Sequence, residues 1–278
     1  MFRVKIRYVL LLFAVFSIAL TGCKNNKDEP SQYVAVASSY LHSIVTELCG
    51  DRQQVFDLVP PGMCPGHFDM SPEQLRRLRG SRAMFRFDFQ AGLDDKLKRV
   101  GMPMIPIQTQ SGMCVPQEYI ATCRQMLPFL VEHGCIDETS AQQHLRQLEI
   151  KLDALAAELK ADIEKSGLTG ANVIVSGHQA DFAQWLGLKV VSIFKSADSM
   201  TPADIETCLR AGRDEDVAIV IANLQEGTEL PDRIARRLNA ALVVFSNFPD
   251  TQTMPNEAFE RLLRSNVNNL VQQVRPER

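Results

Sequence analysis

One turn of this sequence concentrates residues that bind metal ions. Residues 60–72 read PPGMCPGHFDMSP, in which four Pro and two Gly constrain the backbone. This turn presents Cys64, His67 and Asp69, and a distant apolar run ends at His178. Thiolate, imidazole and carboxylate groups are the side chains that hold Zn²⁺ in proteins. The pattern therefore predicts a transition-metal site built from turns that lie far apart in the chain.

A further thiol follows in a similar turn. Residues 111–116 read SGMCVP and repeat the Gly-Met-Cys tripeptide of the first turn, with Cys114 just before an expected helix. Zinc takes four ligands in a tetrahedral array. A Cys₂His₂ set would consist of Cys64, His67, Cys114 and His178. Thiolates would favour Zn²⁺ or Cu⁺ over Mn²⁺, so zinc is expected, with Mn²⁺ and Cu⁺ as alternatives.

The two cysteines have a second interpretation. An exported chain meets an oxidising compartment, where Cys64 and Cys114 could instead form a disulfide that holds the turns rigid. The six cysteines that follow Cys23 allow fifteen pairings, so the spacing does not choose between ligands and a disulfide. Asp69 is expected either to orient His67 or to interact with the start of the next helix.

Alternating apolar runs and amphipathic segments must position these turns. Strands are expected at residues 34–37, 54–59, 83–87, 104–107, 172–176, 189–193, 217–222 and 241–245. Helices are expected at residues 40–49, 71–79, 90–100, 179–186, 202–212, 230–238 and 256–274. Strands that alternate with helices predict parallel sheets in an α/β fold.

A long helix is expected to divide the chain. Residues 137–166 keep apolar side chains at three- and four-residue spacing without Gly or Pro until the end of the run. We interpret this segment as a linking spine helix between an N-terminal α/β lobe, residues 33–136, and a C-terminal α/β lobe, residues 167–278. Ligands of open α/β sheets bind beyond the carboxyl ends of the strands, so a ligand cleft is expected between the lobes.

The N-terminus indicates export. Residues 1–22 combine basic residues with a short apolar run, which is typical of a signal peptide. The run ends at Leu20-Thr-Gly-Cys23, similar to a bacterial lipobox, so Cys23 is expected to carry a lipid anchor. Residues 23–32 would be the lipid-anchored leash of a bacterial protein held at a membrane on the extracytoplasmic side. The net charge of −3 and the lack of a basic stripe argue against nucleic-acid binding.

Five segments give the chain a family resemblance. In order, these are VAVASSY from Val34, LVPPG from Leu58, HFDMSP from His67, VSGH ending at His178, and ANLQ from Ala222. The sequence resembles the cluster 9 metal-binding lipoproteins, the zinc and manganese receptors of ABC transporters. The resemblance implies a monomeric two-lobed receptor, not an enzyme, that binds one divalent cation and passes it to a membrane permease.

Departures from the family pattern affect the site. Gly66 stands where the family usually has its first His, and His67 follows one residue later. Cys114 replaces the second His that the family places near residues 110–117. The family often has acidic residues at two later positions. In this chain the first position is Asn223, and the second is Ser246 or, if the alignment shifts, Asp250. The resemblance therefore carries over His67 and His178 and leaves the other two ligands open.

Other functions compete with a metal receptor. Cys64 or Cys114 with His178 and Asp181 could form a thiol hydrolase, but no catalytic motif accompanies them. A receptor of the same fold for a small organic or chelated ligand is the stronger alternative, because the ligand set is incomplete. An adhesin-like surface lipoprotein with a degenerate metal site is a further alternative.

The lipobox yields a direct test. Cys23→Ser should release the chain from membranes, because the acyl chains that hold it can no longer be attached. Fractionation of cells that express each form measures the effect. An unmodified Cys23 at the native N-terminus, seen by mass spectrometry, would contradict the prediction.

Overall fold

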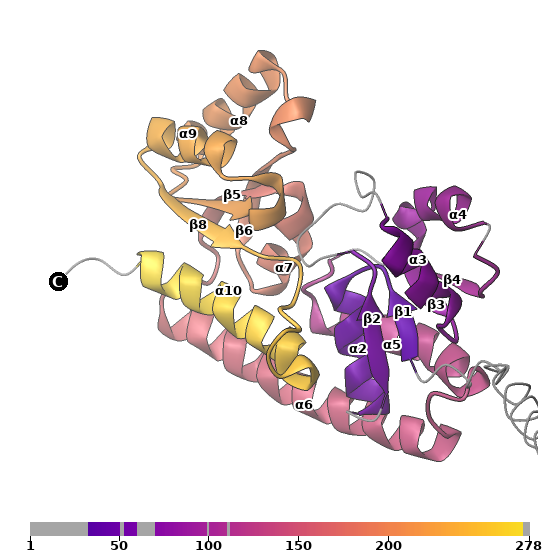
Figure 1. Ribbon diagram of the computed structural model, residues 1–278. Helices are drawn as coiled ribbons and strands as arrows, with labels where there is room; N and C mark the ends of the chain where they lie inside the picture. Colours follow the sequence, from indigo (N-terminus) through magenta and orange to yellow (C-terminus); the bar gives the residue numbers. More distant parts are fainter. Residues whose placement is uncertain (1–32, 51–52, 60–69, 99, 110–111, 275–278) are drawn as a thin grey trace, which may run out of the picture. The chain divides into compact units, whose positions relative to one another are not determined.

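The computed structural model describes residues 33–50, 53–59, 70–98, 100–109 and 112–274 (Figure 1). The predicted signal peptide, Cys23 and the leash lie outside the described residues. So do Cys64, His67 and Asp69. No helix among the described residues is both long and apolar enough to cross a membrane.

The first lobe is a sheet of four parallel strands with the order β2-β1-β3-β4. The strands are β1 (Tyr33–Val36), β2 (Gln54–Asp57), β3 (Met84–Phe87) and β4 (Met104–Ile107). The helices of this lobe are α2 (Ser39–Cys49), α3 (Pro72–Arg79), η2 (Asp88–Gln90), α4 (Gly92–Leu97) and α5 (Pro116–Glu132). The strands are largely buried, as expected for a parallel sheet covered by helices on its two faces.

The second lobe repeats this arrangement with the order β6-β5-β7-β8. Its strands are β5 (Asn172–Ser176), β6 (Lys189–Phe194), β7 (Ile219–Asn223) and β8 (Ala241–Phe245). Its helices are η3 (Gly177–Gln179), α7 (Ala180–Trp185), η4 (Ala197–Ser199), α8 (Pro202–Asp214), η5 (Leu224–Glu226), α9 (Glu229–Leu238), η6 (Pro255–Glu257) and α10 (Ala258–Val274). Two similar parallel sheets confirm the predicted α/β fold class.

Helix α6 (Glu138–Lys165) is the spine that the periodicity predicted. Its 28 residues span about 42 Å at 1.5 Å per residue. Asp137 caps the helix by accepting a hydrogen bond from the Ser140 amide at 2.9 Å. One stripe is buried, consisting of Ala141, Leu145, Leu148, Leu152, Leu155, Ala156, Leu159 and Ile163. Figure 1 shows α6 running alongside α2 and α5 of the first lobe and α10 of the second, which it contacts.

Both lobes share one continuous apolar core. It contains residues of β1, β3, α2 and α5 together with residues of β5, β7, α7 and α10. Within this core the ring of Phe259 in α10 stacks on Tyr119 of α5, with 3.7 Å between the ring centroids. The same Phe259 meets the edge of Tyr40 in α2 at 5.8 Å. One smaller apolar cluster lies on the outer face of the first sheet, under α3 and α4. Another lies on the outer face of the second sheet, under α8 and α9.

Several element ends differ from the predictions by one or two residues, and two of the differences have a visible cause. The strand expected at residues 54–59 ends at Asp57. Its neighbour β1 ends at Val36, whose carbonyl accepts the last hydrogen bond between the two strands, from the Leu58 amide. The helix expected at residues 90–100 is the shorter α4, preceded by the turn η2. In that turn the Gln90 side chain binds the Phe87 amide and the Ala37 carbonyl, which fixes the chain where it leaves β3.

The shared core predicts that the lobes unfold together. Phe259→Ala should lower the free energy of unfolding by about 3–5 kcal/mol, because it removes a buried ring of the second lobe that packs on two rings of the first. The loss should appear in a single transition in denaturant titrations followed by fluorescence and circular dichroism.

Ile150→Ala is the matched control, since Ile150 is 72% exposed on the spine and its loss should change stability by less than about 0.5 kcal/mol. Two separate unfolding transitions in the wild-type protein would contradict a shared core.

Candidate functional site

His178 lies at the carboxyl edge of the second sheet, as the sequence predicted. It belongs to η3, which follows β5 directly. Its side chain is 66% exposed, and its Nε2 atom lies 3.6 Å from Oε1 of Glu226. Glu226 belongs to η5, which follows β7. Because β5 and β7 are adjacent parallel strands, the two turns emerge side by side. The imidazole is therefore accessible and has a carboxylate beside it.

Glu226 is held in place by a buried hydroxyl. Ser176, the last residue of β5, is fully buried and donates a hydrogen bond from Oγ to Oε2 of Glu226. This bond leaves Oε1 directed toward His178. The sequence did not predict Glu226, because the family pattern places an acidic group three residues earlier, where this chain has Asn223 at the end of β7. Its position just past a predicted strand is visible in the sequence, but only the pairing of β7 with β5 places it beside His178.

Neutral amides surround the strand ends behind this pair. Gln179 is fully buried, and its Nε2 donates to Oδ1 of Asn223 at 3.2 Å and to Oδ1 of Asn247 at 2.8 Å. The backbone N–H of Asn247 donates to Oε1 of Gln225 at 3.1 Å. Oε1 of Gln179 has no hydrogen-bond partner among the described residues. The network fixes the turns after β5, β7 and β8 without adding charge.

Cys114 lies in the seam between the lobes. It follows β4 in the first lobe, is 1% exposed, and donates from Sγ to the Ser246 carbonyl at 3.3 Å. Oδ1 of Asn247 lies 3.6 Å from the same sulfur. Cys114 is a free thiol, and burial raises its pKa to about 12. A thiol must lose its proton to bind a metal, so this environment favours a structural role for Cys114 over coordination.

The same turn brings the lobes into close contact. Gly112 has a φ of +74°, and a Cβ atom there would come within 2.8 Å of the Asp181 Cβ in α7. Nearby, the Trp185 indole of α7 donates to Oε1 of Gln117 in α5 at 3.0 Å. Asp181 therefore packs directly against Gly112 of the first lobe. A larger residue at position 112 would collide with it.

The described residues bring together only part of the predicted ligand set. Within these ranges, no group of three or more His, Cys, Asp or Glu side chains is arranged to hold a metal ion. His178 and Cys114 are described, whereas Cys64 and His67 lie outside the described residues. The ligand set Cys64, His67, Cys114 and His178 accordingly stays a prediction, in which His178 is the accessible member.

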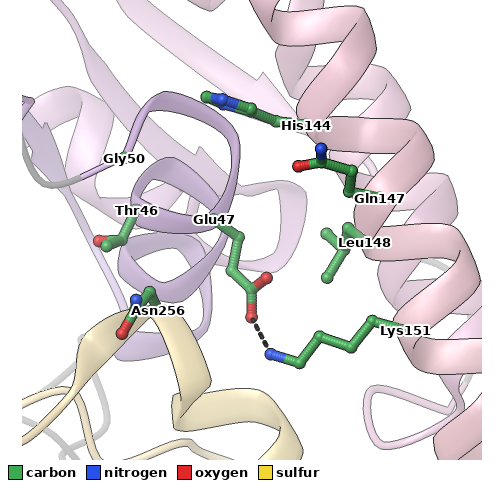
Figure 2. A pocket seen from close by; sticks show the side chains of 8 residues that line it. All are labelled: Thr46, Glu47, Gly50, His144, Gln147, Leu148, Lys151 and Asn256. Carbon is green, nitrogen blue, oxygen red and sulfur yellow. Dashed lines mark ion pairs between the residues drawn. The ribbon is translucent and has the colours of Figure 1, made fainter.

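A separate pocket of about 290 Å³ lies between α2, α6 and η6. It is lined by Thr46, Glu47, Gly50, His144, Gln147, Leu148, Lys151 and Asn256 (Figure 2). Figure 2 shows the Glu47 carboxylate pointing toward the Lys151 ammonium across the pocket, 4.0 Å away. Burial outweighs this attraction and raises the pKa of Glu47 to about 7. His144 donates from Nδ1 to the Leu48 carbonyl at 2.7 Å. This pocket, like the rest of the described residues, contains no group of three or more His, Cys, Asp or Glu side chains that could hold a metal ion.

Comparisons with known proteins agree with this architecture. Residues 129–273, more than half of the chain, match the family described as zinc-uptake complex component A, periplasmic. A candidate metal-binding protein of Chlamydia trachomatis serovar D is 20% identical over 260 residues, which cover 87% of this chain and 94% of that protein.

Solved structures show the same fold. A zinc-bound deletion mutant of ZnuA superposes with a TM-score of 0.72 at 16% identity, covering 89% of this chain and all of that one. A manganese-bound periplasmic metal-binding protein of Candidatus Liberibacter asiaticus gives the same TM-score at 13% identity, covering 87% and 98% of the two chains. An FpvC mutant of Pseudomonas aeruginosa gives 0.65 at 17% identity, covering 87% and 98%.

The burial of Cys114 predicts its reactivity. In the native protein Cys114 should resist iodoacetamide with or without metal, because the protonated, buried thiol is a poor nucleophile. Half-buried Cys135 is the internal control and should react faster. Peptide mapping by mass spectrometry measures the two rates. Labelling of Cys114 in metal-free protein that stops when zinc is added would instead identify Cys114 as a ligand.

Proposed function

We propose that this chain, which belongs to the family of periplasmic component A proteins of zinc-uptake complexes, captures a divalent transition metal outside the cytoplasm. Zinc is the metal we propose, with Mn²⁺ and Cu⁺ as the alternatives raised by the sequence. The observation that carries the proposal is the placement of His178. It is exposed at the carboxyl edge of a parallel sheet, in the lobe that the family match covers and beside a carboxylate.

The solved structures of similar proteins support a divalent ion as the cargo. The ZnuA mutant holds zinc, and the Candidatus Liberibacter asiaticus protein has been solved with manganese and with cadmium. We propose the same class of ion here, because the second lobe offers an imidazole and a carboxylate at its edge. The family consists of solute-binding proteins, which supports a receptor over an enzyme.

The proposed ligands come from turns that follow strands. His67 and His178 are the pair we propose, one from each predicted lobe. Cys64 shares the turn of His67 and is proposed as a further ligand. Cys114 is the least supported member, because its sulfur is occupied by the Ser246 carbonyl and is shielded from solvent.

We also propose that a lipid anchor holds the receptor at a membrane and that the receptor serves an ABC transporter. The predicted signal peptide and Cys23 would place the body at a bacterial membrane, on the extracytoplasmic side, through a lipid anchor. Delivery to a membrane permease of an ABC transporter is the proposed fate of the ion, by a monomeric receptor. The family match supports the transport role, and the anchor rests on the sequence of residues 1–23.

A specific feature favours a second candidate function, the capture of an organic or chelated ligand. Three apolar side chains are exposed at or just after strand ends: Phe89 (58%), Ile193 (50%) and Leu224 (56%). Apolar and amide groups together resemble the lining of sites for small organic molecules. Such a ligand would contact these side chains as well as His178.

The histidine pair provides the test. His67→Ala and His178→Ala should each weaken zinc binding at least about 10-fold, and the zinc-induced rise in melting temperature should shrink, since it follows RT ln(1 + [L]/Kd). Affinity should also fall as the pH is lowered through the histidine range, because an imidazolium does not coordinate a metal. Calorimetry and thermal unfolding measure these effects.

His144→Ala is the control. It removes the bond to the Leu48 carbonyl and should lower stability slightly without changing the zinc-induced shift. Wild-type zinc and manganese binding in the double variant of His67 and His178 would remove the site from these residues and leave the organic-ligand alternative.

A further inference from the structure

We infer that Glu226 binds the captured ion together with His178. The inference rests on the proposed function and adds a ligand to it. Neither Glu226 nor a carboxylate at this position was expected from the sequence.

The spacing of the pair suits a shared ion. Nε2 of His178 and Oε1 of Glu226 are 3.6 Å apart, which is too long for a hydrogen bond with good geometry. Two ligands that each lie about 2.0–2.2 Å from a tetrahedral Zn²⁺ are separated by about 3.4 Å. A cation can therefore bind both atoms after a shift of a few tenths of an ångström.

The carboxylate is already oriented for this task. Within the part of the chain that the structure describes, Glu226 has two polar partners, Ser176 at Oε2 and His178 at Oε1. The Glu226 side chain is 18% exposed, whereas that of His178 is 66% exposed. Ser176 is the buried end of β5, so the hydroxyl that holds the carboxylate belongs to the rigid sheet. A ligand held in this way loses little conformational entropy when an ion binds.

The chemistry of the pair fits such an ion. Imidazole and carboxylate groups both bind Zn²⁺ in proteins, and carboxylates also suit Mn²⁺.

An orienting role for Glu226 would leave a different signature. In that case Glu226 would accept a hydrogen bond from Nε2 of His178, and Nδ1 would bind the metal. Loss of such an outer partner weakens metal binding about 10- to 100-fold but leaves the set of bound atoms unchanged.

The experiment measures Zn²⁺ and Mn²⁺ affinity by calorimetry in the full chain and in variants. Glu226→Gln should weaken Zn²⁺ binding by more than about 100-fold, above the range for outer partners. The visible absorption bands of the Co²⁺-loaded protein, which report the coordinating atoms, should change as well. Glu226→Asp, which keeps a carboxylate, should recover part of the affinity. Glu229→Gln, an exposed change of the same charge three residues later, should behave as wild type.

The outcomes separate this inference from the proposed function. If the wild-type chain binds neither Zn²⁺ nor Mn²⁺, the proposed function fails. If it binds them through His178, but Glu226→Gln changes affinity less than about 3-fold or leaves the Co²⁺ bands unchanged, only the ligand role of Glu226 fails. Melting temperatures of the metal-free variants within a few degrees of wild type exclude misfolding as the cause.

Discussion

The stacking of Phe259 on Tyr119 is the contact on which the rest of the arrangement depends. It joins α10 of the second lobe to α5 of the first within one apolar core, and the spine helix α6 packs along both. Because this core is continuous, the lobes cannot separate without exposing buried aromatic surface to water. The turns at the carboxyl ends of the strands are consequently held in register across the seam, where Gly112 meets Asp181 and Cys114 meets Ser246.

A rigid frame of this kind suits a receptor that recognises a small ion. The second lobe surrounds its strand ends with neutral amides and places one oriented carboxylate next to an exposed imidazole. Each further carboxylate at this edge would strengthen the attraction to a divalent cation. A single oriented carboxylate is therefore compatible with the release of the ion that we propose.

Much of the fold could be predicted from the sequence because parallel strands buried on both faces read as short apolar runs. Residues 172–176 are an example, since the predicted strand is β5. The spine helix was equally clear, because its buried leucines follow helical spacing. The site was harder to predict, since proximity between turns depends on which strands are neighbours. Glu226 could be assigned to the site only once β5 and β7 were known to pair, and the burial of Cys114 only once the lobes were seen to meet.

Metal content of the native protein tests the central claim most directly. Full-length protein purified from its own cells without added metal can be measured by elemental analysis together with native mass spectrometry, in reduced and oxidised samples. The expected result is about one zinc or manganese ion per chain, removed by a chelator at low pH and restored by adding the ion. A chain that carries no metal, takes up none when it is supplied, and retains a bound organic molecule would contradict the assignment of this protein as a metal receptor.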